Sequence, residues 1–164
     1  MDTLKNSTSI SKDNTYKDTT LSPDKRVELL LKEMSIDEKL AQMYCIWEQK
    51  KDVLMDDDGN LTLDKFLKAY PNGIGQIGRL SDTGGGLNNI GGGRTAKEMA
   101  ELANQIQKSL LENTRLGIPA IFHEETLHGL AAMEATSYPQ PIGLASMFNP
   151  ELIKEIFTSI AKDV

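Results

Sequence analysis

Apolar residues recur along this chain at two spacings, one typical of helices and one typical of short buried strands. Apolar positions three or four residues apart predict helices over residues 23–34, 36–43, 63–70, 96–114 and 150–160. The apolar face of the second helix continues as far as Trp47. Four of the helices follow a residue type that caps helices well: Ser22, Ser35, Thr95 and Asn149. These capping residues predict where the helices begin.

Two short apolar runs predict buried strands on either side of the fourth helix. The first is Gly73–Gly78, and the second is Ile118–Phe122. The order strand, helix, strand predicts parallel strands joined by a right-handed crossover. Parallel α/β folds bind ligands at the carboxyl ends of their strands. Polar residues directly after these two strands are therefore the candidates for function.

Composition and charge limit the class of protein. At 164 residues, 39% hydrophobic and 26% charged, the chain is in the range of one soluble domain. Its net charge of −6, without a clustered basic face, argues against a nucleic-acid partner and against a membrane surface. Residues 1–21 are polar and predict a disordered N-terminal tail, followed by one domain over residues 22–164. The first 20 residues lack an apolar core of signal-peptide length, so we expect a cytoplasmic location.

The polar segment from Lys50 to Asn60 is similar to a calcium loop in composition only. Aligning Gly59 with the turn glycine of such a loop puts Leu54 at the first ligand position and Lys65 at the bidentate glutamate. Neither side chain binds calcium, so we predict a solvated turn. The single cysteine, Cys45, cannot form an internal disulfide, and we expect a buried, inert thiol.

The letters of Gly73–Gly78 also fit the dinucleotide fingerprint GxGxxG. A true fingerprint follows a strand and opens a helix. Here Pro71 and Asn72 precede the glycines, and a long glycine-rich loop follows them. The context therefore favours a strand with closely packed glycines over a nucleotide site.

A polar cluster follows the second strand. It consists of His123, Glu124, Glu125 and, three residues later, His128. A zinc-protease HExxH motif needs its histidines four residues apart on one face of a helix, whereas these two are five apart and follow a strand. No GxSxG serine motif and no cysteine-nucleophile signature is present in the sequence. Zinc, serine and cysteine hydrolysis are therefore disfavoured.

Several ordered motifs resemble the N-terminal domain of family 3 glycoside hydrolases, which include β-glucosidases and β-xylosidases. They read RVELLLKEMSIDEKLAQM, NGIGQI, LGIPAIFHEETLHG, ATSYPQPIGLAS and FNPELI. The resemblance covers the chain from about Tyr16 onward and implies a (β/α)8 barrel, with residues 73–78 as its first strand. Such a barrel needs about 250 residues. We therefore expect the front portion of a barrel here, with the remainder of the barrel and a following domain as its partners.

The resemblance implies one substrate residue and leaves a second open. Glu125 matches the acidic residue that hydrogen-bonds hydroxyls of the sugar at the cleavage point. Many members carry aspartate there, and the longer glutamate would suit a pentose such as xylose. Arg79, just after the first predicted strand, is either a sugar contact or an ordinary surface arginine. Glu124 is expected to make a structural hydrogen bond or salt bridge, and His128 and His123 are expected to be structural.

The resemblance also implies what the chain does not contain. A retaining glycosidase uses two carboxyl groups about 5–5.5 Å apart. In this family the nucleophile is an aspartate late in the barrel and the acid/base comes from beyond it, so we name no catalytic residue here. The expected substrate is a β-linked oligosaccharide or glycoside with terminal glucose or xylose, and no metal or organic cofactor is required. The alternative is a catalytically incomplete fragment or subunit that at most binds sugar weakly.

Overall fold

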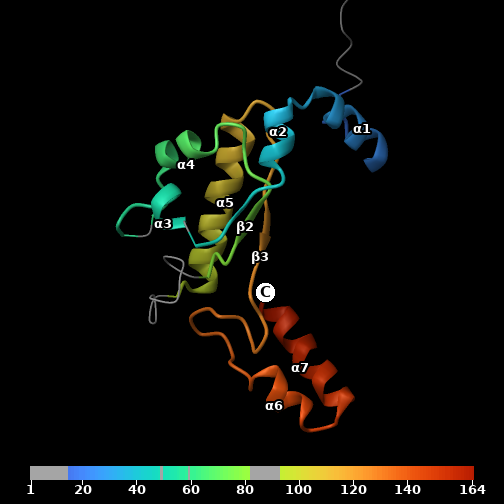
Figure 1. The fold of residues 1–164 in the computed structure, drawn as a ribbon, viewed down its shortest axis with the longest axis vertical. Coiled ribbons are helices and arrows are strands. Elements are labelled where there is room, and N and C mark those ends of the chain that lie inside the picture. The colour runs from blue at the N-terminus through green and yellow to red at the C-terminus, as the bar shows by residue number, and fades with distance from the viewer. Residues whose placement is uncertain (1–14, 49, 59, 82–92) are drawn as a thin grey trace, which may run out of the picture. The chain divides into compact units, whose positions relative to one another are not determined.

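A computed structural model describes residues 15–48, 50–58, 60–81 and 93–164 of the chain (Figure 1). The chain divides into two compact units, Met1–Lys39 and Leu40–Val164. Its described elements are, in order, α1 (Pro23–Glu33), α2 (Ile36–Ala41), β1 (Cys45–Ile46), α3 (Lys50–Val53), α4 (Leu63–Ala69), β2 (Gln76–Gly78), α5 (Ala96–Asn113), β3 (Ile121–His123), α6 (Pro141–Ala145) and α7 (Pro150–Asp163). All five predicted helices are present. Helix α2 is shorter than its apolar face predicts.

Local capping chemistry explains where the helices begin. The hydroxyl of Ser22 accepts a hydrogen bond from the backbone N–H of Lys25, and Asn149 caps α7 in the same way. The predicted capping boxes of α2 and α5 are both formed. In α5, the Thr95 hydroxyl accepts from the Glu98 N–H, while the Glu98 carboxylate accepts from the Thr95 N–H. These starts are confirmed because each depends on residues adjacent in sequence.

The predicted N-terminal tail lies largely outside the described residues. Of residues 1–21, the structure describes only those from Thr15 onward. There the side chain of Asp18 accepts hydrogen bonds from the backbone N–H and the hydroxyl of Thr20. The N–H of Leu21 donates to the carbonyl of Asp18. This stretch therefore forms a hydrogen-bonded turn before α1.

The second unit is built on a sheet of parallel strands in the order β1-β2-β3. Their register aligns Cys45 with Gln76 and Gln76 with Ile121. The parallel arrangement of β2 and β3 confirms the prediction. The expectation that residues 73–78 hold the first strand is wrong, because β1 precedes them and pairs with β2.

Backbone pairing with β2 explains why the helical pattern before β1 stops early. The N–H of Gly75 donates to the carbonyl of Ala41, and the N–H of Gln76 donates to the carbonyl of Tyr44. A side chain at Gly75 would prevent this, since its Cβ would lie 1.9 Å from the backbone oxygen of Gln42. Tertiary pairing through a glycine therefore overrides a local helical periodicity.

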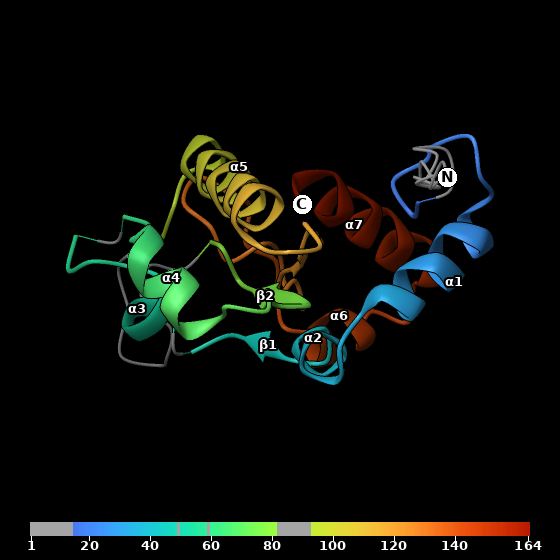
Figure 2. The same cartoon turned by 90° about the horizontal axis from the view of Figure 1, so that it is seen from above.

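One face of the sheet carries the core. Figure 2 shows α4 and α5 on one side of β2. The buried side chains that pack together there are Ile46, Leu54, Met55, Phe66, Ile74, Ile77, Leu80, Leu102, Ile106, Leu110 and Ala120. The opposite face is open: Cys45 and Gln76 are exposed, and Ile121 is 66% exposed. Within the described part of the second unit, buried side chains therefore cover one face of the sheet.

The prediction of a polar, solvated segment over residues 50–60 is correct only for its end. Lys50, Leu54 and Met55 are fully buried. The side chain of Asp56 accepts hydrogen bonds from the N–H groups of Asp58 and Asn60, which closes an exposed turn. The first half of the segment belongs to the core. Over the described stretches of the chain, no helix is both long and apolar enough to span a bilayer.

Replacement of Gly75 by alanine tests the close approach of β2 to the backbone before β1. The added Cβ would meet backbone atoms, which cannot move aside, so we expect a loss of about 3 kcal/mol in the free energy of unfolding. Gly143→Ala is the matched control, because its Cβ would meet only a side-chain carbon 3.8 Å away. We expect that variant to be as stable as the parent or slightly more so. Chemical unfolding followed by circular dichroism measures both, and equal stability of the two variants would contradict the packing described.

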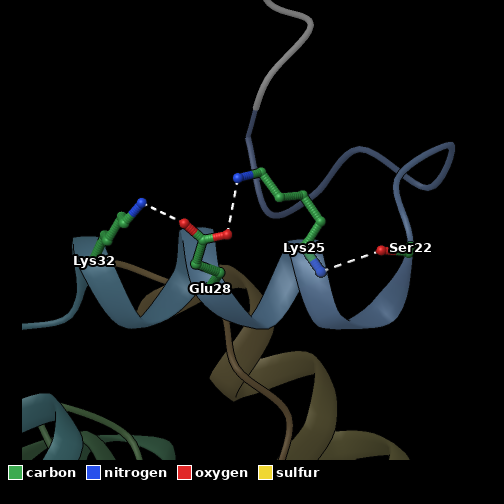
Figure 3. A network of polar contacts seen from close by, with 4 residues as sticks. All are labelled: Ser22, Lys25, Glu28 and Lys32. Carbon is green, nitrogen blue, oxygen red and sulfur yellow. Dashed lines mark hydrogen bonds and ion pairs between the residues drawn. The ribbon is translucent and has the colours of Figure 1, made fainter.

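Glu28 gives α1 a predictable dependence on pH. Its carboxylate lies between the ammonium groups of Lys25 and Lys32 on successive turns (Figure 3). The hydrogen bond from Lys25, then that from Lys32, lowers the pKa of Glu28 from 4.5 to about 2. The pKa of Glu28 is lower in the folded state than in the unfolded state. The ionised carboxylate therefore stabilises the folded helix fully above pH 4.5, and this stabilisation is lost as the pH falls through about 2.

We therefore expect Glu28→Gln to lower the helix content at neutral pH and to leave it unchanged below the depressed pKa. The effect is small and shrinks with added salt, since all three side chains are exposed. Circular dichroism of the chain across an acid titration is the measurement, with Glu101→Gln as the control for a looser pair on α5. Identical titration curves for Glu28→Gln and the parent chain would contradict the role of this pair.

Candidate functional site

The carboxyl ends of the strands meet at one edge of the sheet. Trp47 directly follows β1, Arg79 directly follows β2, and Glu124 and Glu125 follow β3. Continued by one residue, the parallel register puts Arg79 level with Glu124, while Trp47 lies one position before them and Glu125 one position after. Parallel α/β folds bind ligands at this edge. The predicted candidates Arg79 and Glu125 therefore lie on adjacent strand ends, with a tryptophan beside them that sequence reasoning did not select.

Arg79 is held in an unusual backbone conformation. Its φ is +53°, in the left-handed region that costs a residue with a side chain about 1–2 kcal/mol. Its N–H donates to the carbonyl of His123 at 2.7 Å, which ties the end of β2 to the end of β3. Its guanidinium carbon lies 5.8 Å from the centre of the Trp47 ring, within the range of a cation–π contact. The turn thus places the guanidinium over the indole.

Buried Lys50 supports the same turn from the other side. Its ammonium donates to the carbonyl of Gly78 at 2.8 Å. The peptide that precedes Arg79 is therefore held by a charged donor in the protein interior, where such a bond is strong. A lysine in a polar segment gave no signal of burial, so only the structure reveals this contact.

Glu124 fastens the next stretch of chain. Its carboxylate accepts hydrogen bonds from the N–H of Ser81 at 2.9 Å and from the Ser81 hydroxyl at 2.8 Å. The guanidinium of buried Arg94 donates to the carbonyl of Leu80, and the Arg94 N–H donates to that of Ser81. The prediction that Glu124 makes a structural hydrogen bond is confirmed. These hydrogen bonds fix the backbone of Leu80 and Ser81, the two residues that follow Arg79.

Glu125 differs from its neighbour in its surroundings. Its side chain is exposed at the end of β3, whereas that of Glu124 is partly buried against Ser81. An exposed carboxylate at this edge can accept hydrogen bonds from two hydroxyl groups at once. Such charge-assisted hydrogen bonds are stronger than hydrogen bonds between neutral groups. The guanidinium of Arg79 contacts the ring of Trp47, and Glu125 follows the next strand, β3.

The expectation that Cys45 is buried is wrong. The cysteine is exposed on the open face of the sheet, because the alternation in β1 turns Ile46 into the core instead. Its Sγ lies 3.3 Å from Nε2 of His123. The His123 ring reaches it across Gly78, where an added Cβ would lie 2.8 Å from the ring. His123 thus packs on the sheet.

The second histidine of the cluster lies in a loop. The backbone carbonyl of His128 accepts a hydrogen bond from the N–H of Tyr138, so the backbone at this position holds the following loop, in agreement with the structural role expected of His128. His123 ends a strand and neither histidine is in a helix, so the HExxH geometry does not form. Among the residues with described positions, no three histidine, cysteine, aspartate or glutamate side chains gather into a possible metal site.

Comparison with known proteins assigns the chain to a protein family. Residues 35–164 match the model of the glycosyl hydrolase family 3 N-terminal domain. The chain belongs to this family. A putative β-xylosidase of Formosa agariphila is 34% identical over 149 residues, which cover 90% of this chain and 18% of that protein. Beta-glucosidase C of Emericella nidulans is 28% identical over 158 residues, covering 90% of this chain and 23% of the relative.

A further relative matches a shorter part of the chain. A xylan 1,4-β-xylosidase of Xylanibacter ruminicola is 47% identical over 45 residues, or 26% of this chain and 5% of that protein. The chain spans about a fifth of the length of the first two relatives. The resemblance to family 3 glycoside hydrolases is therefore confirmed, and the fold is an α/β fold with parallel strands.

The contrast between the two neighbouring glutamates can be tested by stability. We expect Glu124→Ala to lower the free energy of unfolding by about 2–3 kcal/mol, because a charged acceptor of two hydrogen bonds is lost. Glu125→Ala, the matched control, should cost less than about 0.5 kcal/mol because Glu125 is exposed. Ser81→Ala combined with Glu124→Ala should cost less than the sum of the single changes. Equal losses for the two glutamates would contradict the assignment.

Proposed function

We propose that residues 22–164 form the front portion of a (β/α)8 barrel whose whole polypeptide hydrolyses terminal β-linked xylose or glucose. Family membership supports glycoside hydrolysis, and relatives named β-xylosidase and β-glucosidase match 90% of the chain. The parallel strands alternate with helices, as barrel strands do. The length of these relatives supports a partner role for the rest of the barrel and a further domain.

The observation that carries the proposal is the collection of side chains at the carboxyl edge of the sheet. Glu125 offers an exposed carboxylate there, and Arg79 offers a guanidinium on the neighbouring strand end. A sugar presents hydroxyl groups that both donate and accept hydrogen bonds. Glu125 would accept from two adjacent hydroxyls, while Arg79 would donate, so that together they fix the orientation of the ring.

Xylose is the sugar that we favour over glucose. Glutamate is longer than aspartate by one methylene, so its carboxylate reaches further into a pocket and suits the pentose, which lacks the exocyclic carbon of glucose. Two of the relatives quoted above carry β-xylosidase in their names. The proposed preference for xylose over glucose thus depends on how far the carboxylate of Glu125 extends into the pocket.

The reaction that we propose is the retaining two-step hydrolysis. A nucleophilic carboxylate and an acid/base carboxyl about 5–5.5 Å apart would both come from outside this chain. The role of this chain would be to bind and orient the sugar, with no step that needs a metal or an organic cofactor. By itself it would be a catalytically incomplete subunit with at most weak affinity for sugar.

Assays of two polypeptides test this proposal. We expect a longer polypeptide, extended through the remaining barrel and the next domain, to hydrolyse an aryl β-xyloside with retention of configuration. The 164-residue chain alone should show no turnover above the uncatalysed rate. Nuclear magnetic resonance of the first-formed xylose distinguishes retention from inversion. Turnover by the short chain, or inversion by the long one, would contradict the proposal.

A substitution in the longer polypeptide tests the role of Glu125. We expect Glu125→Asp to raise the ratio of kcat/KM for the aryl β-glucoside to that for the β-xyloside by about tenfold, since one methylene is removed. Glu151→Asp is the matched control, because this exposed glutamate lies in α7. An unchanged ratio in Glu125→Asp would remove the explanation of sugar preference by reach.

A further inference from the structure

We propose that Lys50 is a positioning residue, which orients the peptide unit between Gly78 and Arg79 and thereby places the Arg79 guanidinium for the bound sugar. The inference rests on the proposed function for the identity of the ligand, and it adds to that function a residue from outside the family motifs. Lys50 does not touch the sugar. It acts through the backbone of Arg79, which follows β2 at the carboxyl edge of the sheet.

The peptide unit between Gly78 and Arg79 is held on both sides. Its carbonyl accepts a hydrogen bond from Nζ of Lys50 at 2.8 Å, and its N–H donates to the carbonyl of His123 at 2.7 Å. The carbonyl and the N–H of a trans peptide point in opposite directions. Lys50 is the first residue of α3, which follows β1, whereas His123 ends β3. Groups next to both neighbouring strands therefore fix the rotation of this one peptide unit.

The rotation of this peptide unit determines the strain at Arg79, because turning the unit changes ψ of Gly78 and φ of Arg79 together. As the unit is held, φ of Arg79 is +53°, a left-handed value that a residue with a Cβ rarely adopts. Half a turn would return this angle to the preferred negative range, but it would take the carbonyl away from Lys50. A hydrogen bond from a charged donor typically contributes more than the strain of one left-handed residue costs. The ammonium of Lys50 can therefore keep the peptide in its strained orientation.

The burial of Lys50 argues for a role of its charge beyond packing. Its side chain is 0% exposed, whereas its neighbour Lys51 in the same helix is exposed. Burying an ammonium group costs free energy, and a methionine of similar length would fill the same space without that cost. A methionine cannot donate to the carbonyl of Gly78. The charged group thus serves the orientation of the peptide unit rather than the filling of the core.

The orientation of the peptide unit decides where the Arg79 side chain lies, since φ sets the direction of the Cα–Cβ bond relative to the preceding chain. In the observed orientation the guanidinium carbon is 5.8 Å from the centre of the Trp47 ring. Trp47 and Lys50 belong to the same connection after β1. That connection therefore contacts the guanidinium of Arg79 and also holds the carbonyl before it. Arg79 can donate to a sugar hydroxyl only from a defined place, so Lys50 controls binding without contacting the ligand.

Nuclear magnetic resonance of the 164-residue chain tests the backbone role of Lys50 without any ligand. A positive φ brings an amide proton close to the Hα of its own residue, so Arg79 should show a strong nuclear Overhauser effect between the two. We expect Lys50→Met to weaken this effect to the level of residues with negative φ, because the peptide unit turns once its charged donor is lost. Lys50→Arg should keep the effect, since it keeps a charged donor. An equally strong effect in Lys50→Met and the parent chain, or a weak one in the parent, would overturn the proposal.

Two further variants separate orientation from folding. Lys51→Met is the matched control, because it removes an exposed lysine from the same helix, and we expect it to keep the strong effect at Arg79. Lys50→Gln is uncharged and shorter by one bond, and it replaces Lys50→Met if the latter does not fold. Circular dichroism establishes that each variant keeps its helix content. Unfolding of both Lys50→Met and Lys50→Gln would show that Lys50 serves the fold itself, and it would overturn the positioning role.

Kinetics of the longer polypeptide test whether the orientation of Arg79 matters for the sugar. We expect Lys50→Met to raise KM for the aryl β-xyloside several-fold with little change in kcat, as Arg79→Met should do. The double variant should be no worse than Arg79→Met alone, because Lys50 acts through Arg79. Lys50→Arg should restore KM, and Lys51→Met should leave it unchanged.

These kinetics distinguish failure of the positioning role from failure of the proposed function. An unchanged KM in Lys50→Met, or additive effects in the double variant, would reject the positioning role and leave the glycosidase standing. Conversely, no hydrolysis by the longer parent polypeptide would reject the glycosidase. The nuclear Overhauser effect in the short chain would then still decide whether Lys50 orients Arg79.

Discussion

The close approach of β2 to its two neighbours is the constraint on which the rest of the second unit depends. Gly75 makes backbone bonds on both sides: its N–H donates to Ala41, and its carbonyl accepts from the N–H of Ile121 at 2.8 Å. The space for these bonds exists only because position 75 lacks a Cβ. One glycine thus sets the register of β1, β2 and β3, and the register sets which residues meet at the carboxyl edge.

At that edge, Lys50, His123 and Glu124 hold the backbone by hydrogen bonds, whereas the carboxylate of Glu125 faces solvent. Lys50 and the carbonyl of His123 hold the two polar groups of the peptide unit that precedes Arg79, and Glu124 holds Ser81. Each of these bonds joins segments that are distant in sequence. The strand ends are therefore rigidly connected before any ligand arrives, which reduces the entropy that binding has to overcome.

What the sequence could predict follows from how local each interaction is. The starts of α1, α5 and α7 were predictable because Ser22, Thr95 and Asn149 cap residues only three positions away. The structural role of Glu124 was predictable from strand alternation and the family resemblance. Strand β1 was not, because its residues continue a helical pattern that only pairing with β2 interrupts. The burial of Lys50, the exposure of Cys45 and the contact of Trp47 with Arg79 depend on the same pairing, so they were missed together.

The two adjacent glutamates show how one strand end can combine support with binding. Successive side chains beyond a strand point to opposite sides, so Glu124 and Glu125 cannot share one environment even though their chemistry is the same. Each carboxylate oxygen of Glu124 accepts one hydrogen bond, from the N–H or from the hydroxyl of Ser81, so both oxygens already have a partner within the protein. Glu125 keeps an exposed carboxylate, and the bonds of its neighbour hold its backbone still. A ligand bound by Glu125, as proposed above, would therefore benefit from an anchor that it does not touch, namely the hydrogen bonds of Glu124 to Ser81.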